Sequence, residues 1–151
     1  APSACVAGRG ETVRPVVVEG VRWVVLVNPG FGVNTKWAYQ ELATTRTAVT
    51  PLSIVQQELD RQSKLNWNQL IAAAENDFEA PVFAAHGKIR EIKQSLQAYG
   101  AEIALLSGSG ATVFGLFADE ARARLAQTQF ANERTLKVFV VPTCSGPLGW
   151  R

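Results

Sequence analysis

The sequence predicts an α+β fold in which helices cover one face of a mainly antiparallel, four-stranded sheet. Apolar runs of strand length recur along the chain, and segments with a helical spacing of apolar residues lie between them. A short glycine-rich loop joins two consecutive strands in the second half of the chain. So short a loop favours antiparallel pairing, because parallel strands need a long crossover connection. A two-layer sandwich then buries the apolar stripes of the helices against the sheet.

The amino-terminal part of the chain predicts strands. Residues 1–14 favour a short strand and a turn, because paired glycines permit positive φ. The apolar segments 16–18 and 23–27 flank a Glu-Gly pair, which predicts a β-hairpin that leads into a buried strand. One proline and two glycines in residues 28–32 then end this strand in a loop.

Three helices are expected next. The first begins near Thr35, where apolar residues resume a helical spacing. A second begins at Thr50, a capping residue followed by a proline that suits the first helical position. A third begins at Asn66, and the side chain of Gln69 can return the hydrogen bond to this cap.

The clearest helix ends at Gly100, a typical C-cap residue. Its apolar stripe consists of Ile89, Ile92, Leu96 and Tyr99. After this helix the apolar spacing changes to that of strands, which we expect at 103–106 and 112–117.

One more helix and one more strand complete the prediction. Asp119 caps a helix that runs to about Gln129, and the last strand covers residues 136–141. We expect this helix to bury a face made of Ala121, Leu125 and Thr128.

The composition is that of an ordinary globular domain. The chain has 151 residues, of which 47% are hydrophobic and 19% charged, with a net charge of +2. The positive residues are scattered, so we expect no nucleic-acid partner. No apolar run approaches the roughly 18–20 residues that span a bilayer, so we expect no membrane partner. One histidine and two cysteines without ligand spacing predict no metal site.

The glycine-rich loop, residues 107–112, is the first candidate site. It contains four residues of interest: Ser107, Gly108, Ser109 and Gly110. Two glycines allow successive N–H groups to face one concavity, which suits phosphate oxygens. The alternative is that the glycines serve only the turn between two strands. The loop is neither a Walker A motif nor a dinucleotide fingerprint, because the required lysine and third glycine are absent.

The strand-end loop, residues 28–34, and the helix after it form the second candidate site. Thr35 offers a hydroxyl group, while Phe31, Trp37 and Tyr39 offer flat faces on which a base can stack. The alternative is that these aromatic side chains fill the core.

Other polar residues are weaker candidates. Asn76, Asp77 and Glu79 either contact a ligand or form hydrogen bonds at a helix end, and we favour the second interpretation. His86 precedes a glycine at a helix start, where capping or exposure to solvent is favoured over catalysis. We identify no catalytic residue in the chain.

Taken together, four motifs resemble those of the GHMP kinases, in particular the members that act on 4-diphosphocytidyl-2-C-methyl-D-erythritol. In the order of the family, the motifs are residues 8–11, residues 28–30 with Thr35 and Tyr39, residues 76–79, and residues 105–115. The segment Asn76-Asp77-Phe78-Glu79, for example, is similar to Asn-Asp-Leu-Glu in those kinases.

The resemblance implies a ferredoxin-like carboxyl-terminal domain over residues 21–151, with residues 1–20 as the end of an amino-terminal kinase domain or a linker. The family's catalytic aspartate and lysine map to no residue of this chain. We therefore expect a fragment that binds no cofactor and is inactive by itself. Its missing partner would be the amino-terminal kinase domain.

For the full-length enzyme, the resemblance implies transfer of phosphate from ATP, with Mg²⁺, to the cytidine diphosphate-linked methylerythritol of non-mevalonate isoprenoid synthesis. Tyr39 would stack on the cytosine, Thr35 would contact the substrate, and residues 107–110 would line the phosphate region. Such an enzyme is expected in a bacterial-type cytoplasm or a plastid. Two alternatives remain. The first is a GHMP kinase of the homoserine or mevalonate type, and the second is a stand-alone ferredoxin-like domain with a ligand-binding or regulatory role.

Overall fold

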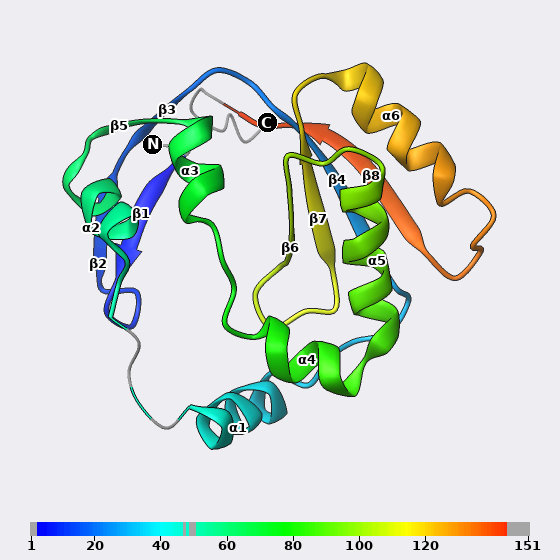
Figure 1. Cartoon of the computed structure of the whole chain (residues 1–151), viewed down its shortest axis with the longest axis horizontal. Coiled ribbons are helices and arrows are strands. Elements are labelled where there is room, and N and C mark those ends of the chain that lie inside the picture. Colours follow the sequence, from blue (N-terminus) through cyan, green and yellow to red (C-terminus); the bar gives the residue numbers. More distant parts are fainter. Residues whose placement is uncertain (1–2, 47, 49–50, 145–151) are drawn as a thin grey trace, which may run out of the picture. The chain divides into compact units, whose positions relative to one another are not determined.

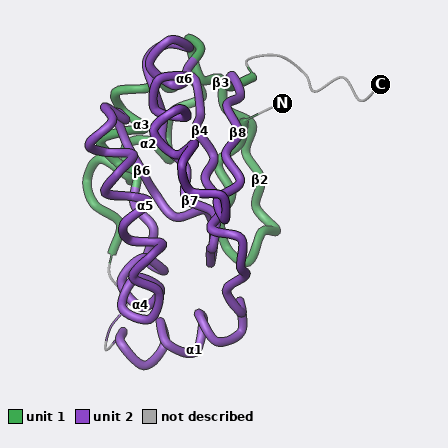
Figure 2. Tube along the Cα trace, turned by 90° about the vertical axis from the view of Figure 1, so that its right-hand side faces the viewer, with its two compact units in different colours: residues 1–21, 50–74, 143–151 green, residues 22–49, 75–142 purple. Residues whose placement is uncertain are grey.

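The computed structural model describes residues 3–46, 48 and 51–144. The chain divides into two compact units (Figure 2). Unit 1 comprises residues 1–21, 50–74 and 143–151, and unit 2 comprises residues 22–49 and 75–142. The domain boundary that the family resemblance implies stays a prediction. No helix in the described part of the chain is long and apolar enough to cross a membrane.

Unit 2 contains a four-stranded antiparallel sheet with the strand order β6-β7-β4-β8 (Figure 1). Its strands are β4 (Trp23–Asn28), β6 (Ile103–Leu106), β7 (Val113–Phe117) and β8 (Lys137–Pro142). With the helices between them, the chain order is βαββαβ, the order of a ferredoxin-like fold. The predicted α+β sandwich and its antiparallel sheet are therefore confirmed.

One face of this sheet forms the core of unit 2. Successive side chains of a strand point to opposite faces, so Val25 and Val27 share a face with Val113 and Phe117, their neighbours on β7. All four side chains are fully buried. They belong to one apolar cluster with residues of α5 (Gly87–Ala98) and α6 (Glu120–Gln129), so both helices cover the same face.

Local capping explains where the helices of unit 2 begin and end. Helix α1 (Thr35–Thr45) begins after Asn34, whose side chain accepts the N–H of Trp37 at 3.0 Å. Asp119 caps α6 as predicted, because its Oδ1 accepts the N–H of Arg122 at 2.9 Å. Helix α5 ends at Ala98, and the predicted Gly100 follows the cap residue Tyr99 with φ +88°. A short helix, α4 (Glu79–Ala85), was not predicted.

The predicted inner face of α6 is wrong. Its buried residues are Ala123 and Ala126, followed by Phe130, whereas Leu125 is 64% exposed. These three also repeat at helical spacing, and the two alanines let the helix backbone approach the sheet closely. The large apolar side chain of Leu125 therefore lies on the solvent-exposed face of this helix.

Unit 1 consists of short elements. The strands are β1 (Ala4–Ala7) and β2 (Thr12–Pro15), which form an antiparallel hairpin, and β3 (Val17–Glu19) and β5 (Lys64–Asn66), which pair in parallel. The helices are α2 (Ile54–Arg61) and α3 (Trp67–Ala73). The predicted hairpin between residues 16–18 and 23–27 is wrong, because β3 pairs with β5, and β4 pairs with β7 and β8 on its two edges.

The two helices of unit 1 both begin with a capping box. For α3 it is the predicted one, since Asn66 accepts the N–H of Gln69 at 3.0 Å and Gln69 accepts that of Asn66 at 2.9 Å. For α2 the predicted start is wrong. Ser53 caps this helix in a reciprocal pair with Gln56, and the expected cap, Thr50, lies outside the described residues.

Candidate functional site

Both candidate loops lie at the same end of the unit 2 sheet. The strand-end loop follows β4 and the glycine-rich loop precedes β7, and these strands are antiparallel, with Val27 opposite Val113. The hydroxyl oxygens of Thr35 and Ser109 are 2.9 Å apart. The Nδ2 of Asn28 also donates to the hydroxyl of Thr112 at 3.0 Å. Hydrogen bonds thus join the two loops, which are separated by about half of the chain.

The strand-end loop turns at Gly30. The N–H of Gly30 donates to Oδ1 of Asn28 at 2.9 Å, which closes the turn locally. Gly30 has φ +87°, and a Cβ added there would lie 2.7 Å from the carbonyl oxygen of Thr135. Only glycine therefore allows this loop to pass so closely by the residues that precede β8.

The glycine-rich loop is closed by two hydrogen bonds of its own. The N–H of Ser107 donates to the carbonyl of Thr112 at 2.8 Å, and the N–H of Gly110 donates to that of Ser107 at 3.0 Å. Among the described residues, no acceptor takes the N–H of Gly108 or of Ser109. The loop therefore leaves two backbone donors that can bind phosphate oxygens.

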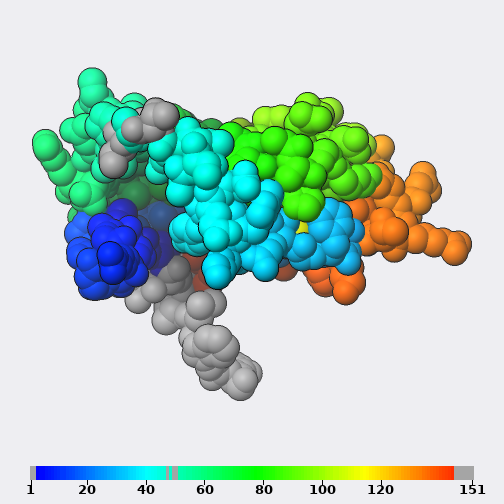
Figure 3. All heavy atoms as spheres, turned by 90° about the horizontal axis from the view of Figure 1, so that it is seen from below, coloured from blue at the N-terminus to red at the C-terminus, as the bar shows by residue number. Residues whose placement is uncertain are grey.

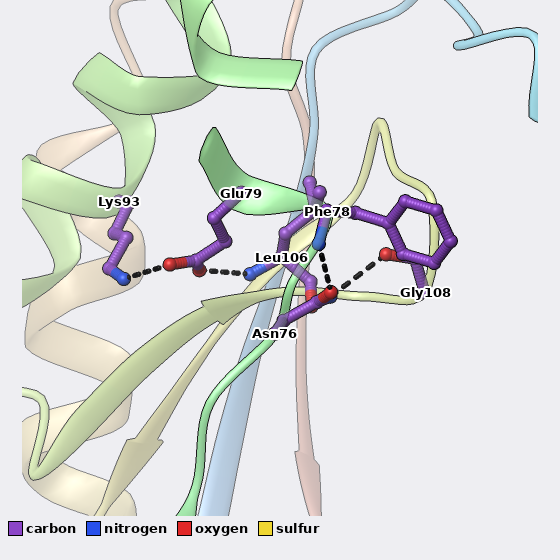
Figure 4. Close-up of polar contacts among 6 residues, drawn as sticks. All are labelled: Asn76, Phe78, Glu79, Lys93, Leu106 and Gly108. Carbon is purple, nitrogen blue, oxygen red and sulfur yellow. Dashed lines mark hydrogen bonds and ion pairs between the residues drawn. The ribbon is translucent and has the colours of Figure 1, made fainter. Parts of the chain in front are cut away.

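Asn76 contacts the glycine-rich loop directly (Figure 4). Its Nδ2 donates to the carbonyl oxygens of Leu106 at 2.7 Å and of Gly108 at 2.8 Å. Its Oδ1 accepts the N–H of Phe78 at 3.0 Å, just before α4. The favoured prediction of a hydrogen-bonding group at a helix end is confirmed, but the contact with the loop was not predicted.

Glu79 lies on the other side of the same strand end (Figure 4). Its Oε1 accepts the N–H of Leu106 at 2.9 Å, and its Oε2 pairs with Nζ of Lys93 on α5 at 2.5 Å. The side chains of Glu79 and Lys93 are 16% and 19% exposed. The lysine balances the charge of a largely buried carboxylate, which would be costly to bury without a partner.

Tyr39 and Phe78 form an aromatic pair beside the loop. Their ring centroids are 4.8 Å apart at 84°, an edge-to-face arrangement. Tyr39 is 60% exposed, so the prediction that its ring fills the core is excluded. Trp37, in contrast, packs against the core. Of these two aromatic residues of α1, Trp37 therefore has the predicted alternative role of packing in the core, and Tyr39 does not.

His86 packs between two aromatic rings. Its ring centroid lies 5.7 Å from that of Phe31 and 5.6 Å from that of Trp37. His86 occupies the C-cap position of α4, where its N–H donates to the carbonyl of Val82 at 2.8 Å, and the N-cap position of α5. The predicted capping role is therefore confirmed for its backbone, while its side chain makes no capping hydrogen bond. The histidine is half-buried and belongs to the packing of the strand-end loop against α1.

An ion pair and a lysine flank the site on the surface. Asp77 forms an exposed ion pair with Arg46, just after α1. Lys36 is exposed at the start of α1. Figure 3 shows that α1, the strand-end loop and α4 share one face of unit 2. Lys36 and the Asp77 pair therefore border the site without joining its hydrogen-bond network.

Unit 2 is thus a ferredoxin-like α+β domain. At one end of its sheet lie an exposed aromatic residue and a loop with two backbone N–H groups that are free of acceptors among the described residues. Residues 55–134 match the family described as "GHMP kinases C terminal", more than half of the chain, and the chain belongs to this family.

Two proteins with similar sequences are named as kinases. The chain is 36% identical over 134 residues to 4-diphosphocytidyl-2-C-methyl-D-erythritol kinase of Syntrophus aciditrophicus (strain SB), covering 89% of this chain and 46% of the relative. It is 40% identical over 112 residues to the protein of the same name in Geobacter sp. (strain M21), covering 74% and 38%. The chain thus spans less than half the length of either relative.

Solved structures share the fold. A crystal structure of 4-(cytidine 5'-diphospho)-2C-methyl-D-erythritol kinase matches with a TM-score of 0.65 and 23% identity, over 91% of this chain and 48% of the other. A homoserine kinase from Cytophaga hutchinsonii matches with a TM-score of 0.62 and 15% identity, over 89% and 45%. At these identities the likeness concerns the fold alone.

Proposed function

We propose that this chain is the substrate-side part of an ATP-dependent kinase that phosphorylates 4-diphosphocytidyl-2-C-methyl-D-erythritol in non-mevalonate isoprenoid synthesis. The names of its relatives support the substrate. The observation that carries the proposal is the 2.9 Å contact between Thr35 and Ser109, because it brings the predicted substrate contact to the predicted phosphate loop. Such a substrate and ATP fit the cytoplasmic location expected from the sequence.

The proposed roles follow from position and chemistry. Thr35 and Tyr39 are four residues apart on α1, so they face the same side of this helix. Tyr39 would stack on the cytosine with its exposed ring, and Thr35 would hold the neighbouring part of the substrate. The residues from Ser107 to Gly110 would line the phosphate region.

The residues present suit the anionic part of ATP or of the substrate. The free N–H groups of Gly108 and Ser109 can donate to phosphate oxygens. When bound, ATP supplies the phosphoryl group and Mg²⁺ neutralises its charge. Among the described residues, no cluster of three or more His, Cys, Asp or Glu could hold a metal ion, so we assign no Mg²⁺ ligand to this chain.

A substrate panel tests the proposal. The protein that contains this chain and has the full length of its relatives is given ATP and Mg²⁺ with the cytidyl substrate, homoserine or mevalonate, and ADP is measured. We expect ADP release with the cytidyl substrate only. ADP release with homoserine or mevalonate would contradict the proposed substrate and assign another GHMP activity. No ADP release with any of the three would contradict kinase activity and favour a ligand-binding domain.

The stacking role has its own test. Tyr39→Ala should weaken binding of the cytidyl substrate by about 5- to 100-fold, because a base stacked on an aromatic ring gains about 1–3 kcal/mol. Binding of an ATP analogue should change less than about twofold. Tyr39→Phe keeps the ring and is the matched control, which should bind like the wild type. Equal losses for both ligands in calorimetric titrations would contradict stacking.

A further inference from the structure

At the end of β6, two side chains form hydrogen bonds with the backbone on the outer edge of the sheet. β6 is an edge strand of the sheet, and no strand among the described residues pairs with its outer backbone groups. At Leu106, Oε1 of Glu79 accepts the N–H and Nδ2 of Asn76 donates to the carbonyl. Two side chains thus take the place that a neighbouring strand would occupy, at the residue before the glycine-rich loop.

One amide group connects this strand end to both sides of the candidate site. The Nδ2 of Asn76 donates to Leu106 and, at 2.8 Å, to Gly108 at the outer part of the loop. The Oδ1 of the same amide accepts the N–H of Phe78, whose ring contacts Tyr39. All three contacts depend on the amide having both a carbonyl oxygen and an NH₂ group.

We propose that Asn76 is a positioning residue, which fixes the glycine-rich loop relative to the Tyr39–Phe78 aromatic pair. Together with the contact between Thr35 and Ser109, this side chain then sets the distance between the phosphate donors and the stacking ring. This inference rests on the proposed function, because the loop and Tyr39 are two sides of that site. Geometry matters here, since phosphoryl transfer depends mainly on positioning.

Glu79 and Lys93 hold the segment that carries Asn76. The carboxylate is fixed at both oxygens, by the N–H of Leu106 and by Nζ of Lys93 on α5. Because α5 packs in the core of unit 2, this pair connects the start of α4 to the core of the domain. Asn76 is therefore presented to the loop from a fixed support, as a positioning residue requires.

The variant Asn76→Asp isolates the contact with the loop. Aspartate has nearly the same shape and keeps an acceptor for the N–H of Phe78. It replaces the NH₂ donor by a negatively charged oxygen that faces two carbonyl oxygens, so the loop is repelled. The matched control is Asp77→Asn, a carboxylate-to-amide change at the next residue, which is exposed and pairs with Arg46.

Hydrogen exchange of the 151-residue chain reports the position of the loop without an activity assay. The amides of Ser107 and Gly110, which close the loop, should exchange at least about tenfold faster in Asn76→Asp, because the loop opens more often. Amides of β7 and all amides in Asp77→Asn should change less than about twofold. Unchanged exchange at both Ser107 and Gly110 would overturn the proposal.

Kinetics of the full-length enzyme provides the second measurement. Asn76→Asp should lower kcat about tenfold or more, while KM for the cytidyl substrate changes less than about threefold. A rise in KM with unchanged kcat would overturn the positioning role. If wild-type enzyme does not act on this substrate, the proposed function fails while the exchange result still decides the role of Asn76. Should the aspartate variant not fold, Asn76→Ala removes both N–H donors of the amide and takes the place of Asn76→Asp in both measurements.

Discussion

At the scale of single residues, Gly110 is the position at which the site tolerates least change. It has φ +95°, and an added Cβ would lie 3.0 Å from Cδ1 of Leu106. Gly110→Ala should therefore lower the free energy of unfolding by about 2 kcal/mol, from backbone strain and crowding together. Urea unfolding of the chain measures this change.

Gly32→Ala is the matched control for this prediction. Gly32 does not have a positive φ, and an added Cβ would meet no atom within 4 Å. Alanine there should be neutral or stabilise by about 0.4–1 kcal/mol, because it restricts the unfolded chain. Similar losses at both positions would contradict the conformational argument for Gly110.

The ion pair between Glu79 and Lys93 predicts a non-additive response. Lys93→Met removes the partner of a carboxylate that is only 16% exposed, and should destabilise the domain by about 2–3 kcal/mol. Glu79→Gln keeps an acceptor for the N–H of Leu106 without the charge. The double variant should thus be at least about 1 kcal/mol more stable than the sum of the two single losses predicts. Additive losses in urea unfolding would show that the pair is not coupled.

Contacts between residues close in sequence could be predicted, and contacts between distant ones could not. The caps at Asn66 and Asp119 involve residues three positions apart, so the sequence indicates them directly. Asn76 reaches Leu106 across 30 residues, and only the topology of the sheet brings the two together. The pairing of Thr35 with Ser109 was expected as shared membership of one site, because of the resemblance, but not as a hydrogen bond.

At the scale of elements, α6 shows how an apolar pattern can mislead. The stripe through Leu125 and the stripe through Phe130 both repeat at helical spacing, and the sequence does not decide between them. The choice is made by the close approach of two alanines to the sheet. The strands of unit 2 were predicted well because their apolar runs have the length of strands, and most are rich in β-branched or aromatic residues or lie next to glycine or proline.

Substitutions on the two faces of α6 test this assignment. Phe130 is 4% exposed, so Phe130→Ala should cost about 3–5 kcal/mol of unfolding free energy. Leu125 is 64% exposed, and Leu125→Ala should stay within about 0.5 kcal/mol of wild type. Urea unfolding of both variants gives the comparison. If Leu125→Ala lost more unfolding free energy than Phe130→Ala, the face predicted from the sequence would be the buried one.

At the scale of the whole molecule, the described residues offer free backbone donors in the glycine-rich loop and an exposed aromatic ring at one end of the sheet. The expectation from the family resemblance, that the catalytic aspartate and lysine lie outside this chain, stays a prediction. Fold class and antiparallel sheet followed from the sequence. The pairing partner of β3 did not, because short apolar segments fit several neighbours equally well.

The 151-residue chain by itself should therefore show no formation of ADP that depends on the cytidyl substrate. The measurement is a coupled ADP assay on chain produced in cells that lack the full-length enzyme, so that contamination is excluded. The full-length enzyme, assayed in parallel, is the control for reagents. Turnover by the isolated chain would mean that groups in these residues carry out the chemistry.

The central place of β4 also determines the order of events during synthesis on the ribosome. β4 ends at Asn28, yet its two partners begin only at Val113 and Lys137. At about 5–20 residues per second, this strand waits roughly 5–20 s before its first partner emerges. Until then an apolar strand with two open edges is exposed to other nascent chains, so this domain is expected to fold late and to depend on chaperones in crowded cells.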